Sequence, residues 1–370
     1  MSKSITFWIN AGPMSRGVFV FAVVLFCGCT AMGPRTIDRD RFDYVSAISE
    51  SLKRQTLLNL LKTRYQDVPV FLDIASVINQ YAMERQLGLG VEGEFYNRGE
   101  PSFIGPSFSA GGRFEDRPTI TYNPLMGPDF ARSVMSPIPL SAILPLIQSG
   151  YPADYVLRIC TQSVQGLQNR RTGPIGARDA DPAFYEMLRL FRELADQDAI
   201  TIRSRKIDDK RKMMIQFSTP ANAADRDTLK TFYRLLKLDP AVKEFPVVRG
   251  RSTSDQNEIA IMSRSLLQVM IAYSSAIDVP ESDIAEGRVY AVRQERAVDG
   301  QIFPPFIKVS NGKIEPDDAY VAVPYRDSWF WIDDRDLHSK AMFSFLVILK
   351  SFTERENGQF AAPVISVPTN

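Results

Sequence analysis

Histidine, cysteine and long apolar runs are all scarce in this chain of 370 residues. The single histidine excludes a histidine-rich zinc cage, because such a site needs several imidazole ligands. Of the three cysteines, Cys27 and Cys29 end an apolar run near the N-terminus. The third, Cys160, lies in an apolar stretch, where we expect a small buried side chain without a disulfide partner. An exported protein without disulfides is stabilised by its core, for which a hydrophobic content of 45% is ample.

The chain also lacks an excess of charge of either sign. It carries 44 Lys and Arg residues against 43 Asp and Glu residues. Removal of residues 1–28 would take away Lys3 and Arg16 but no acidic residue, which leaves 42 basic residues and a net charge near minus one. Because there is no global attraction toward a phosphate backbone, we expect no nucleic-acid partner.

The N-terminus has the pattern of an export signal. The apolar run 17–26 follows Lys3 and Arg16. A core of about 7 to 15 apolar residues suits a secretory signal and is shorter than the roughly 20 residues of a membrane-spanning helix. Gly28 supplies the small residue that a lipoprotein peptidase accommodates before the modified cysteine. We therefore predict that residues 1–28 are a lipoprotein signal peptide and that Cys29 is the site of lipid attachment.

An alternative is ordinary signal cleavage after Ala31. The tripeptide Cys29-Thr30-Ala31 fits the small-x-small pattern of that cleavage site. Cleavage there would discard the cysteine and release a soluble periplasmic protein. The two interpretations therefore differ in whether the mature chain is tethered to a membrane.

The first part of the mature chain combines a helix with a long hairpin. Residues 29–45 are interpreted as a linker after the lipid anchor, and 46–65 have the apolar spacing of an amphipathic helix. Apolar residues fall on odd positions over 81–97 and on even positions over 107–122, which is the period of strands. Turn residues at 98–101 and 105–106 separate the two stretches. We predict a long β-hairpin over 81–122.

Helical and strand patterns alternate along the rest of the chain. Apolar spacing predicts helices over 140–148, 153–168, 183–195, 224–238, 263–276 and 337–352. Short apolar runs predict strands over 70–74, 200–202, 213–217, 246–248, 320–323, 328–332 and 363–367. Asn311-Gly312 predicts a type I′ turn. The expected fold is α+β, with mostly antiparallel strands and a C-terminal strand-helix-strand unit.

The stretch 169–181 is the candidate domain boundary, because it contains two glycines, one proline and three arginines. It would separate an N-terminal helical region, residues 46–170 with the hairpin, from a C-terminal α+β domain, residues 181–370.

The sequence GLGVEG at 88–93 matches the G-x-G-x-x-G spacing of dinucleotide-binding loops. That motif works where a strand ends and a helix opens, so that the helix N-terminus can hold a pyrophosphate. Here the strand alternation continues through the motif, which indicates glycines in a hairpin. We expect no nucleotide and no other cofactor.

His338, the only histidine, follows Asp333, Asp334 and Asp336 at the start of the last predicted helix. An Asp/His pair is typical of acid-base catalysis, and carboxylates near an imidazole also occur in metal sites. The simpler interpretation is that one of these aspartates caps the helix N-terminus. We therefore assign no catalytic residue and no metal ligand, and keep an enzyme using His338 as the third alternative.

Four segments resemble a family of uncharacterised Gram-negative lipoproteins over most of the mature chain: DRFDY at 40–44, RPTITY at 117–122, QSGYP at 148–152 and FWIDDRDL at 330–337. The resemblance implies a location in the cell envelope and brings no activity or catalytic residues. In such lipoproteins an aspartate after the modified cysteine specifies the inner membrane. Because Thr30 stands there, the resemblance implies the periplasmic face of the outer membrane.

Taken as a sequence, the chain is expected to be a non-enzymatic outer-membrane lipoprotein. Its role would be structural, in assembly or in export, through contacts with other envelope proteins or with itself. The main alternative is an oligomeric pore lipoprotein that donates the 81–122 hairpin to a shared β-barrel, because strands longer than about 9 to 11 residues can cross a membrane.

Overall fold

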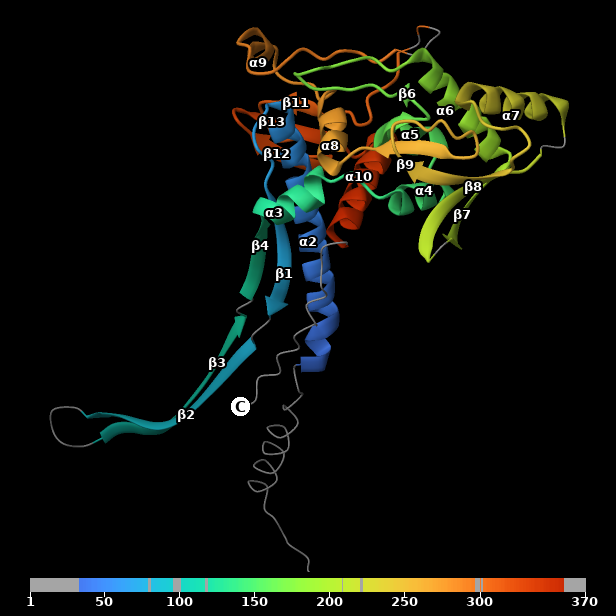
Figure 1. Ribbon diagram of the computed structural model, residues 1–370. Helices are drawn as coiled ribbons and strands as arrows, with labels where there is room; N and C mark the ends of the chain where they lie inside the picture. The colour runs from blue at the N-terminus through green and yellow to red at the C-terminus, as the bar shows by residue number, and fades with distance from the viewer. Residues whose placement is uncertain are drawn as a thin grey trace, which may run out of the picture. The chain divides into compact units, whose positions relative to one another are not determined.

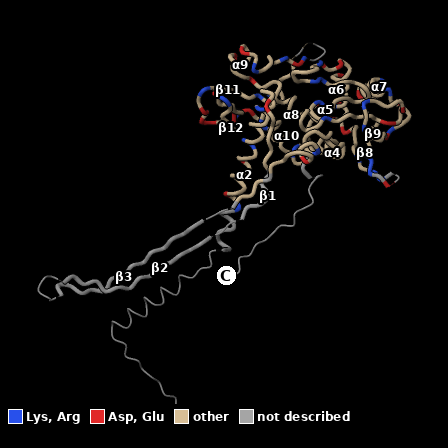
Figure 2. The backbone as a smooth tube through the Cα atoms, turned by 60° about the vertical axis from the view of Figure 1, so that its left-hand side comes forward, with Lys and Arg blue, Asp and Glu red and all other residues tan. Residues whose placement is uncertain are grey.

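The structure is a computed structural model that describes residues 33–78, 81–95, 101–116, 119–207, 209–219, 222–296, 300 and 302–355. Cys29, the signal peptide and the predicted strand 363–367 lie outside these ranges. By its internal contacts the chain divides into residues 1–54 and residues 55–370. Figure 1 shows the elements in chain order, and Figure 2 shows both signs of charge interspersed along the described backbone.

Helix α2 (Gly33–Arg64) begins earlier than the sequence pattern indicates. The expectation of a linker over 29–45 is wrong from Gly33 onward. Proline in the first turn of a helix costs no hydrogen bond, and Pro34 is the second residue of α2. After it, no glycine or proline interrupts the segment. Ion pairs from Glu50 to Lys53 and Arg54 add i, i+3 and i, i+4 contacts along the same helix.

Two antiparallel pairs follow α2. Strand β1 (Phe71–Ile78) pairs with β4 (Thr119–Leu125), and β2 (Tyr81–Phe95) pairs with β3 (Pro101–Asp116). The register of β2 and β3 joins Tyr81 to Asp116, so odd positions of one strand oppose even positions of the other. The two alternating sets found in the sequence are therefore in register.

The hairpin differs from its prediction at two places. The predicted strand 107–122 is divided between β3 and β4, and β4 pairs with β1 rather than with β2. Gly105-Pro106 is not a turn, because these residues lie inside β3 opposite Glu92 and Val91. A proline is tolerated there because both strands of a two-stranded pair have a free edge.

A six-stranded sheet forms the second half of the fold, in the order β6, β5, β10, β9, β8, β7. Its strands are β5 (Thr161–Val164), β6 (Leu167–Gln168), β7 (Ile200–Ile207), β8 (Lys210–Phe217), β9 (Glu244–Arg249) and β10 (Ile259–Ser263). Within it β9 and β10 are parallel and the other neighbours are antiparallel. Helices α5 (Ala153–Cys160), α6 (Pro182–Asp196) and α7 (Ala223–Leu236) share a hydrophobic core with this sheet.

The predicted helix 153–168 is too long, because α5 ends at Cys160. The chain then forms the short hairpin β5–β6. Its two-residue turn is Gln165-Gly166, with φ of 49° and 88°. Positive φ at both turn positions matches the right-handed twist of the paired strands, which explains why a hairpin forms here.

A three-stranded antiparallel sheet has the order β11, β13, β12. Its strands are β11 (Ser310–Gly312), β12 (Ala319–Tyr325) and β13 (Ser328–Asp333). It shares a second core with α2, α4 (Leu140–Gln148), α5, α8 (Leu266–Ser274) and α10 (Leu337–Arg355). Short helical segments are α3 (Gly127–Phe130), the π-helix η1 (Ala131–Met135) and α9 (Glu281–Ala285).

The predicted type I′ turn at Asn311-Gly312 is wrong, because both residues lie in β11 opposite Phe330 and Trp329. A Cβ added to Gly312 would lie 3.2 Å from Cη2 of Trp331, so this glycine admits the indole ring. In β13 the side chain of Phe330 is buried, and those of Trp329 and Trp331 are half-buried. Strand alternation therefore places Phe330 in the core.

Helices α4 and α5 connect the two cores. Leu144 and Leu157 belong to the core of the six-stranded sheet, whereas Ile143 and Val156 belong to the core around α10. The same sheet contains β5 and β6 before the segment 169–181 and β7 to β10 after it. Residues 55–370 form an α+β unit with mostly antiparallel strands. Among the described helices, none is both long enough and apolar enough to cross a membrane.

Candidate functional site

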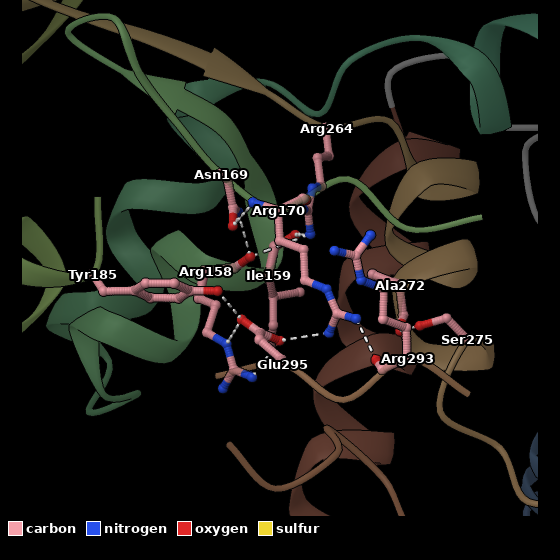
Figure 3. Close-up of polar contacts among 10 residues, drawn as sticks. All are labelled: Arg158, Ile159, Asn169, Arg170, Tyr185, Arg264, Ala272, Ser275, Arg293 and Glu295. Atoms are coloured by element: carbon pink, nitrogen blue, oxygen red, sulfur yellow. Dashed lines mark hydrogen bonds and ion pairs between the residues drawn. The ribbon is translucent and has the colours of Figure 1, made fainter. Parts of the chain in front are cut away.

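A mostly buried carboxylate, Glu295, lies at the centre of a polar cluster (Figure 3). Arg158, from α5, donates to both of its oxygens, with Nη2 2.7 Å from Oε2 and Nε 3.0 Å from Oε1. Arg170, just after β6, reaches Oε2 at 3.4 Å, and the Tyr185 hydroxyl, from α6, donates to Oε1 at 2.8 Å. This cluster therefore joins segments that are more than 100 residues apart in the chain.

Burial works to raise the pKa of Glu295, but the hydrogen bonds from Arg158 and Tyr185 outweigh it and hold the pKa below its ordinary value. Burial also raises the pKa of the Tyr185 phenol, and the neighbouring Glu295 carboxylate raises it further, so the net shifts of the two groups are opposite. Glu295 is therefore an ionised acceptor, and Tyr185 is a neutral donor.

Arg158 is also held by aromatic rings. Its guanidinium carbon lies 4.3 Å from the ring centre of Phe303 and 4.6 Å from that of Phe306. Such cation–π contacts favour a guanidinium over a partly desolvated ring. The bidentate ion pair and the two rings together fix Arg158 in one position.

Arg264, between β10 and α8, is as buried as Arg158, with 6% of its surface exposed. Its guanidinium donates to the carbonyl oxygens of Arg158 and Ile159 at 3.2 Å each, and also to that of Arg170. Burial lowers the pKa of Arg264 to about 10. Among the described residues, no carboxylate accepts a hydrogen bond from Arg264. Arg158 and Arg170 share the single carboxylate of Glu295, and Arg264 bonds only carbonyl oxygens, so three positive charges stand against one negative charge, an excess of two.

A cleft of about 540 Å³ opens beside this cluster. We call it the arginine cleft. Its polar lining consists of arginines and neutral residues: Arg170, Arg171, Arg178, Arg251, Arg264, Gln162, Gln168, Asn169, Thr172 and Gln268, with Gln66 at one side. The segment 173–176 and Ile271 supply its apolar wall.

Comparison of the chain with protein-family models, with curated proteins and with solved structures finds no match.

The amide groups of the arginine cleft are fixed by local structure. Ser265 and Gln268 form a capping box at the start of α8, in which each side chain bonds the other residue's backbone N–H. Gln162, on β5, donates to the Gln268 amide oxygen at 3.1 Å. Gln168 accepts from Arg178 at 3.2 Å and from Arg251 at 3.1 Å through one oxygen. Hydrogen bonds therefore fix the side-chain amides that line the arginine cleft, and the acceptor that Arg178 and Arg251 share is a neutral amide.

The segment 169–181, interpreted from the sequence as a domain boundary, contributes three of the cleft arginines: Arg170, Arg171 and Arg178. Three arginines in one short loop were the sequence feature that could have indicated this site. Arg251 and Arg264 are about 80 to 90 residues further along the chain. The apolar periodicity of the sequence does not show that the fold brings them next to the loop 169–181.

The hydrogen bonds of the Asp336 carboxylate go to the start of α10 rather than to His338. Asp336 caps α10, since its carboxylate accepts from the Ser339 backbone N–H at 2.9 Å and from the Ser339 hydroxyl at 2.7 Å. Partial burial works to raise the pKa of Asp336, but these bonds outweigh it and lower the pKa. His338 is exposed and lies against the ring of Tyr155, with 5.8 Å between ring centres. Within the described part of the chain no hydrogen bond joins His338 to an aspartate. The helix-cap interpretation is confirmed for Asp336.

Two further sequence interpretations are tested by the structure. The G-x-G-x-x-G sequence 88–93 lies inside β2, so it is part of a strand as expected. Cys160 is fully buried in α5, and burial raises the pKa of its thiol to about 12. Cys29 lies outside the described residues.

An exposed apolar strip is the second notable surface. On β1 and β4, Phe71 is buried and Leu125 packs against the core, which places one face of this strand pair inward. The opposite face carries Leu72, Ile120 and Tyr122, with 42%, 40% and 51% of their surfaces exposed. We call these three residues the β1–β4 strip. Adjacent large apolar side chains on one exposed face are typical of an interaction surface.

Proposed function

We propose that this protein is a non-enzymatic lipoprotein of the outer membrane, facing the periplasm. It would serve envelope structure, assembly or export through contacts with other proteins. The observation that carries the proposal is the sequence Gly28-Cys29 directly after the apolar run 17–26. Helix α2 starts at Gly33, four residues after Cys29, so the proposed lipid would be joined closely to the first helix of the mature chain.

The β1–β4 strip supports a role through protein contacts. Its side chains are apolar and exposed on a strand pair whose other face contacts the core through Phe71 and Leu125. Burial of apolar surface is the main favourable term in most protein association. A protein partner that covers Leu72, Ile120 and Tyr122 would therefore bind with a hydrophobic contribution.

The lipid anchor is tested by labelling cells with radioactive palmitate. We expect the wild-type protein and Cys27→Ser to incorporate label and Cys29→Ser to incorporate none, because only Cys29 follows a small residue. Cys27→Ser is the matched control, since it makes the same change two residues away. Unlabelled wild-type protein, as expected for cleavage after Ala31, would contradict the proposal.

The contact surface is tested by photo-crosslinking in intact cells. A photoreactive amino acid at Tyr122 is expected to give discrete crosslinked protein bands. The same amino acid at Ile314, which is also highly exposed but lies outside the β1–β4 strip, serves as the control. The same products from both positions, or none from Tyr122, would remove the strip as a binding surface.

A second candidate, an oligomeric pore to which each subunit donates its hairpin, is favoured by strand length. Strand β2 has 15 residues and β3 has 16, more than the roughly 9 to 11 of a membrane-crossing strand. Native extraction in a mild detergent followed by light scattering distinguishes the two functions. A stable ring that is lost when residues 81–116 are deleted supports the pore. A monomeric wild-type protein opposes the pore and leaves the first proposal in place.

A further inference from the structure

The arginine cleft carries more positive charge than its own residues neutralise. Arg158, Arg170 and Arg264 are buried or nearly so around a single acceptor carboxylate, Glu295. Buried charges are costly unless they are paired and hydrogen-bonded, and carbonyl dipoles compensate a guanidinium only in part. An anion in the adjoining cleft would supply the missing negative charge.

The rim of the arginine cleft adds further donors. Among the described residues, Arg178 and Arg251 each make their side-chain bonds through Nη2 to neutral acceptors, so their other N–H groups can donate to a ligand. The guanidinium of Arg171 lies against Gly176, where an added Cβ would be 3.3 Å from Nη2. Glycine at this point, with φ of 66°, lets the loop pass close to the arginine. No acidic residue lines the cleft in the described part of the chain.

We propose that the arginine cleft binds the phosphoryl group of an organic phosphate. Guanidinium groups present paired donors that match phosphate oxygens bidentately, and arginines here come from three separate segments: 170–178, 251 and 264. A phosphomonoester carries up to two negative charges, which equals the excess of two positive charges around Glu295, whereas a carboxylate carries one.

The size of the arginine cleft indicates an organic ligand rather than a bare ion. Its volume of about 540 Å³ lies within the range of small-molecule sites. The amides of Gln162, Gln168 and Gln268 line its polar side, and Ile271 and the segment 173–176 provide an apolar wall. The phosphate would lie against the arginines and the organic part against this wall. The same chemistry is presented by a free phosphate ester and by the headgroup of phosphatidic acid.

Binding is measured on the full chain in a non-ionic detergent and a phosphate-free buffer of fixed ionic strength. The probes are glycerol 3-phosphate and dihexanoyl phosphatidic acid, with sodium acetate as a singly charged anion control and dihexanoyl glycerol as an uncharged control. We expect at least one phosphate probe to raise Tm and to give saturable heat of binding, and the controls to do neither. Binding of glycerol 3-phosphate indicates a free ester, and binding of the phosphatidic acid alone indicates a lipid source.

The matched variants are Arg178→Ala, Arg251→Ala and Arg203→Ala. The first two remove exposed rim residues of the arginine cleft, and the third removes an exposed arginine on β7, so all three change the net charge equally. Arg178→Ala and Arg251→Ala are each expected to weaken phosphate binding about tenfold, which is 1.4 kcal/mol, and Arg203→Ala to leave it unchanged.

The proposal is overturned by no binding of either phosphate probe, by equal binding of acetate, or by an equal loss of affinity in Arg203→Ala. In those cases the buried arginines only hold β5, the loop 169–181 and α8 together. The test does not depend on the lipid at Cys29, because Cys29→Ser is expected to bind the same phosphate probe with the same affinity.

Discussion

Glu295 is the residue on which the polar cluster depends. Its two carboxylate oxygens accept from Arg158, Arg170 and Tyr185 in a mostly buried setting. Removing one partner of a buried ion pair leaves an uncompensated charge, which typically destabilises a protein by about 3 to 5 kcal/mol. We expect Glu295→Gln to lower the free energy of unfolding by this amount in urea denaturation. Glu193→Gln, which removes an exposed helix pair with Arg189, is the control and should cost less than about 1 kcal/mol.

The effect of Glu295 depends on pH with a definite sign. Its folded pKa is lowered, so the carboxylate stabilises the fold above its unfolded pKa of about 4.3 and loses this effect as the pH falls through the folded pKa. The stability difference between wild type and Glu295→Gln should therefore be constant from pH 7 to 5 and shrink below about pH 4. A difference that grows on acidification would show that Glu295 is not the ionised partner of these arginines.

Gly312 is required by the indole of Trp331. A Cβ on Gly312 would lie 3.2 Å from Cη2 and 3.3 Å from Cζ3 of that ring, closer than ordinary contact. We expect Gly312→Ala to destabilise the protein by about 1 kcal/mol or more, since overpacking typically costs 1 to 3 kcal/mol. Gly250→Ala is the matched control, because its added Cβ would meet only Ser252 O at 3.8 Å. Thermal unfolding monitored by tryptophan fluorescence measures both, and equal Tm values would exclude the predicted clash.

At the scale of single elements, the start of α10 is stabilised by its cap rather than by its histidine. Asp336 accepts two hydrogen bonds from Ser339, whose side chain is buried and whose Oγ also accepts from the Lys308 backbone N–H at 2.8 Å. Loss of an N-cap costs about 1 kcal/mol. We expect Asp336→Ala to lower stability by about this amount and His338→Ala to change it by less than about 0.5 kcal/mol. A larger effect of His338→Ala in chemical denaturation would reverse this assignment.

The elements that the sequence predicted best are those defined by local signals. Helix α4 has the predicted bounds, and α6 differs by one residue at each end, with Pro182 in its first turn. Strand β10 was missed, because its apolar run of four residues, 259–262, is short and was assigned to no element, and its last residue, Ser263, was assigned to the following helix. Asn311-Gly312 was misread because its position is decided by pairing with β13, which comes 16 residues later. Local chemistry therefore predicted helices, whereas long-range pairing decided the position of β10 and of Asn311-Gly312.

The candidate site was the least predictable part. The Arg158–Glu295 pair spans 137 residues and the Arg264–Arg170 contact spans 94. Such distant residues meet only because β5 and β10 pair and α5 packs between two cores. The sequence did indicate that residues 169–181 were unusual in their glycine, proline and arginine content. It gave no means to see that arginines from this loop would adjoin Arg251 and Arg264.

At the scale of residues 55–370, two cores are joined through shared helices. Each of α4 and α5 sends one set of side chains to the core of the six-stranded sheet and another set to the core around α10. Strand β5 pairs with β10, and Arg158 pairs with Glu295. The segments before and after the loop 169–181 therefore contribute to the same sheet and to the same polar cluster. The loop 169–181 therefore connects parts that stabilise one another, although its composition is that of a linker.

This coupling predicts the result of cutting the chain in the loop. Ile175 has 81% of its surface exposed, so a protease site inserted there should be cleaved without disturbing either core. We expect the two fragments to co-elute in size-exclusion chromatography and to separate in urea, because β5–β10 pairing and the shared packing of α4 and α5 hold them together. Residues 181–370 produced alone lack β5 and both helices, and should show no cooperative unfolding. Independent elution of the cut fragments, or a cooperative transition of 181–370 alone, would instead establish a true domain boundary at 169–181.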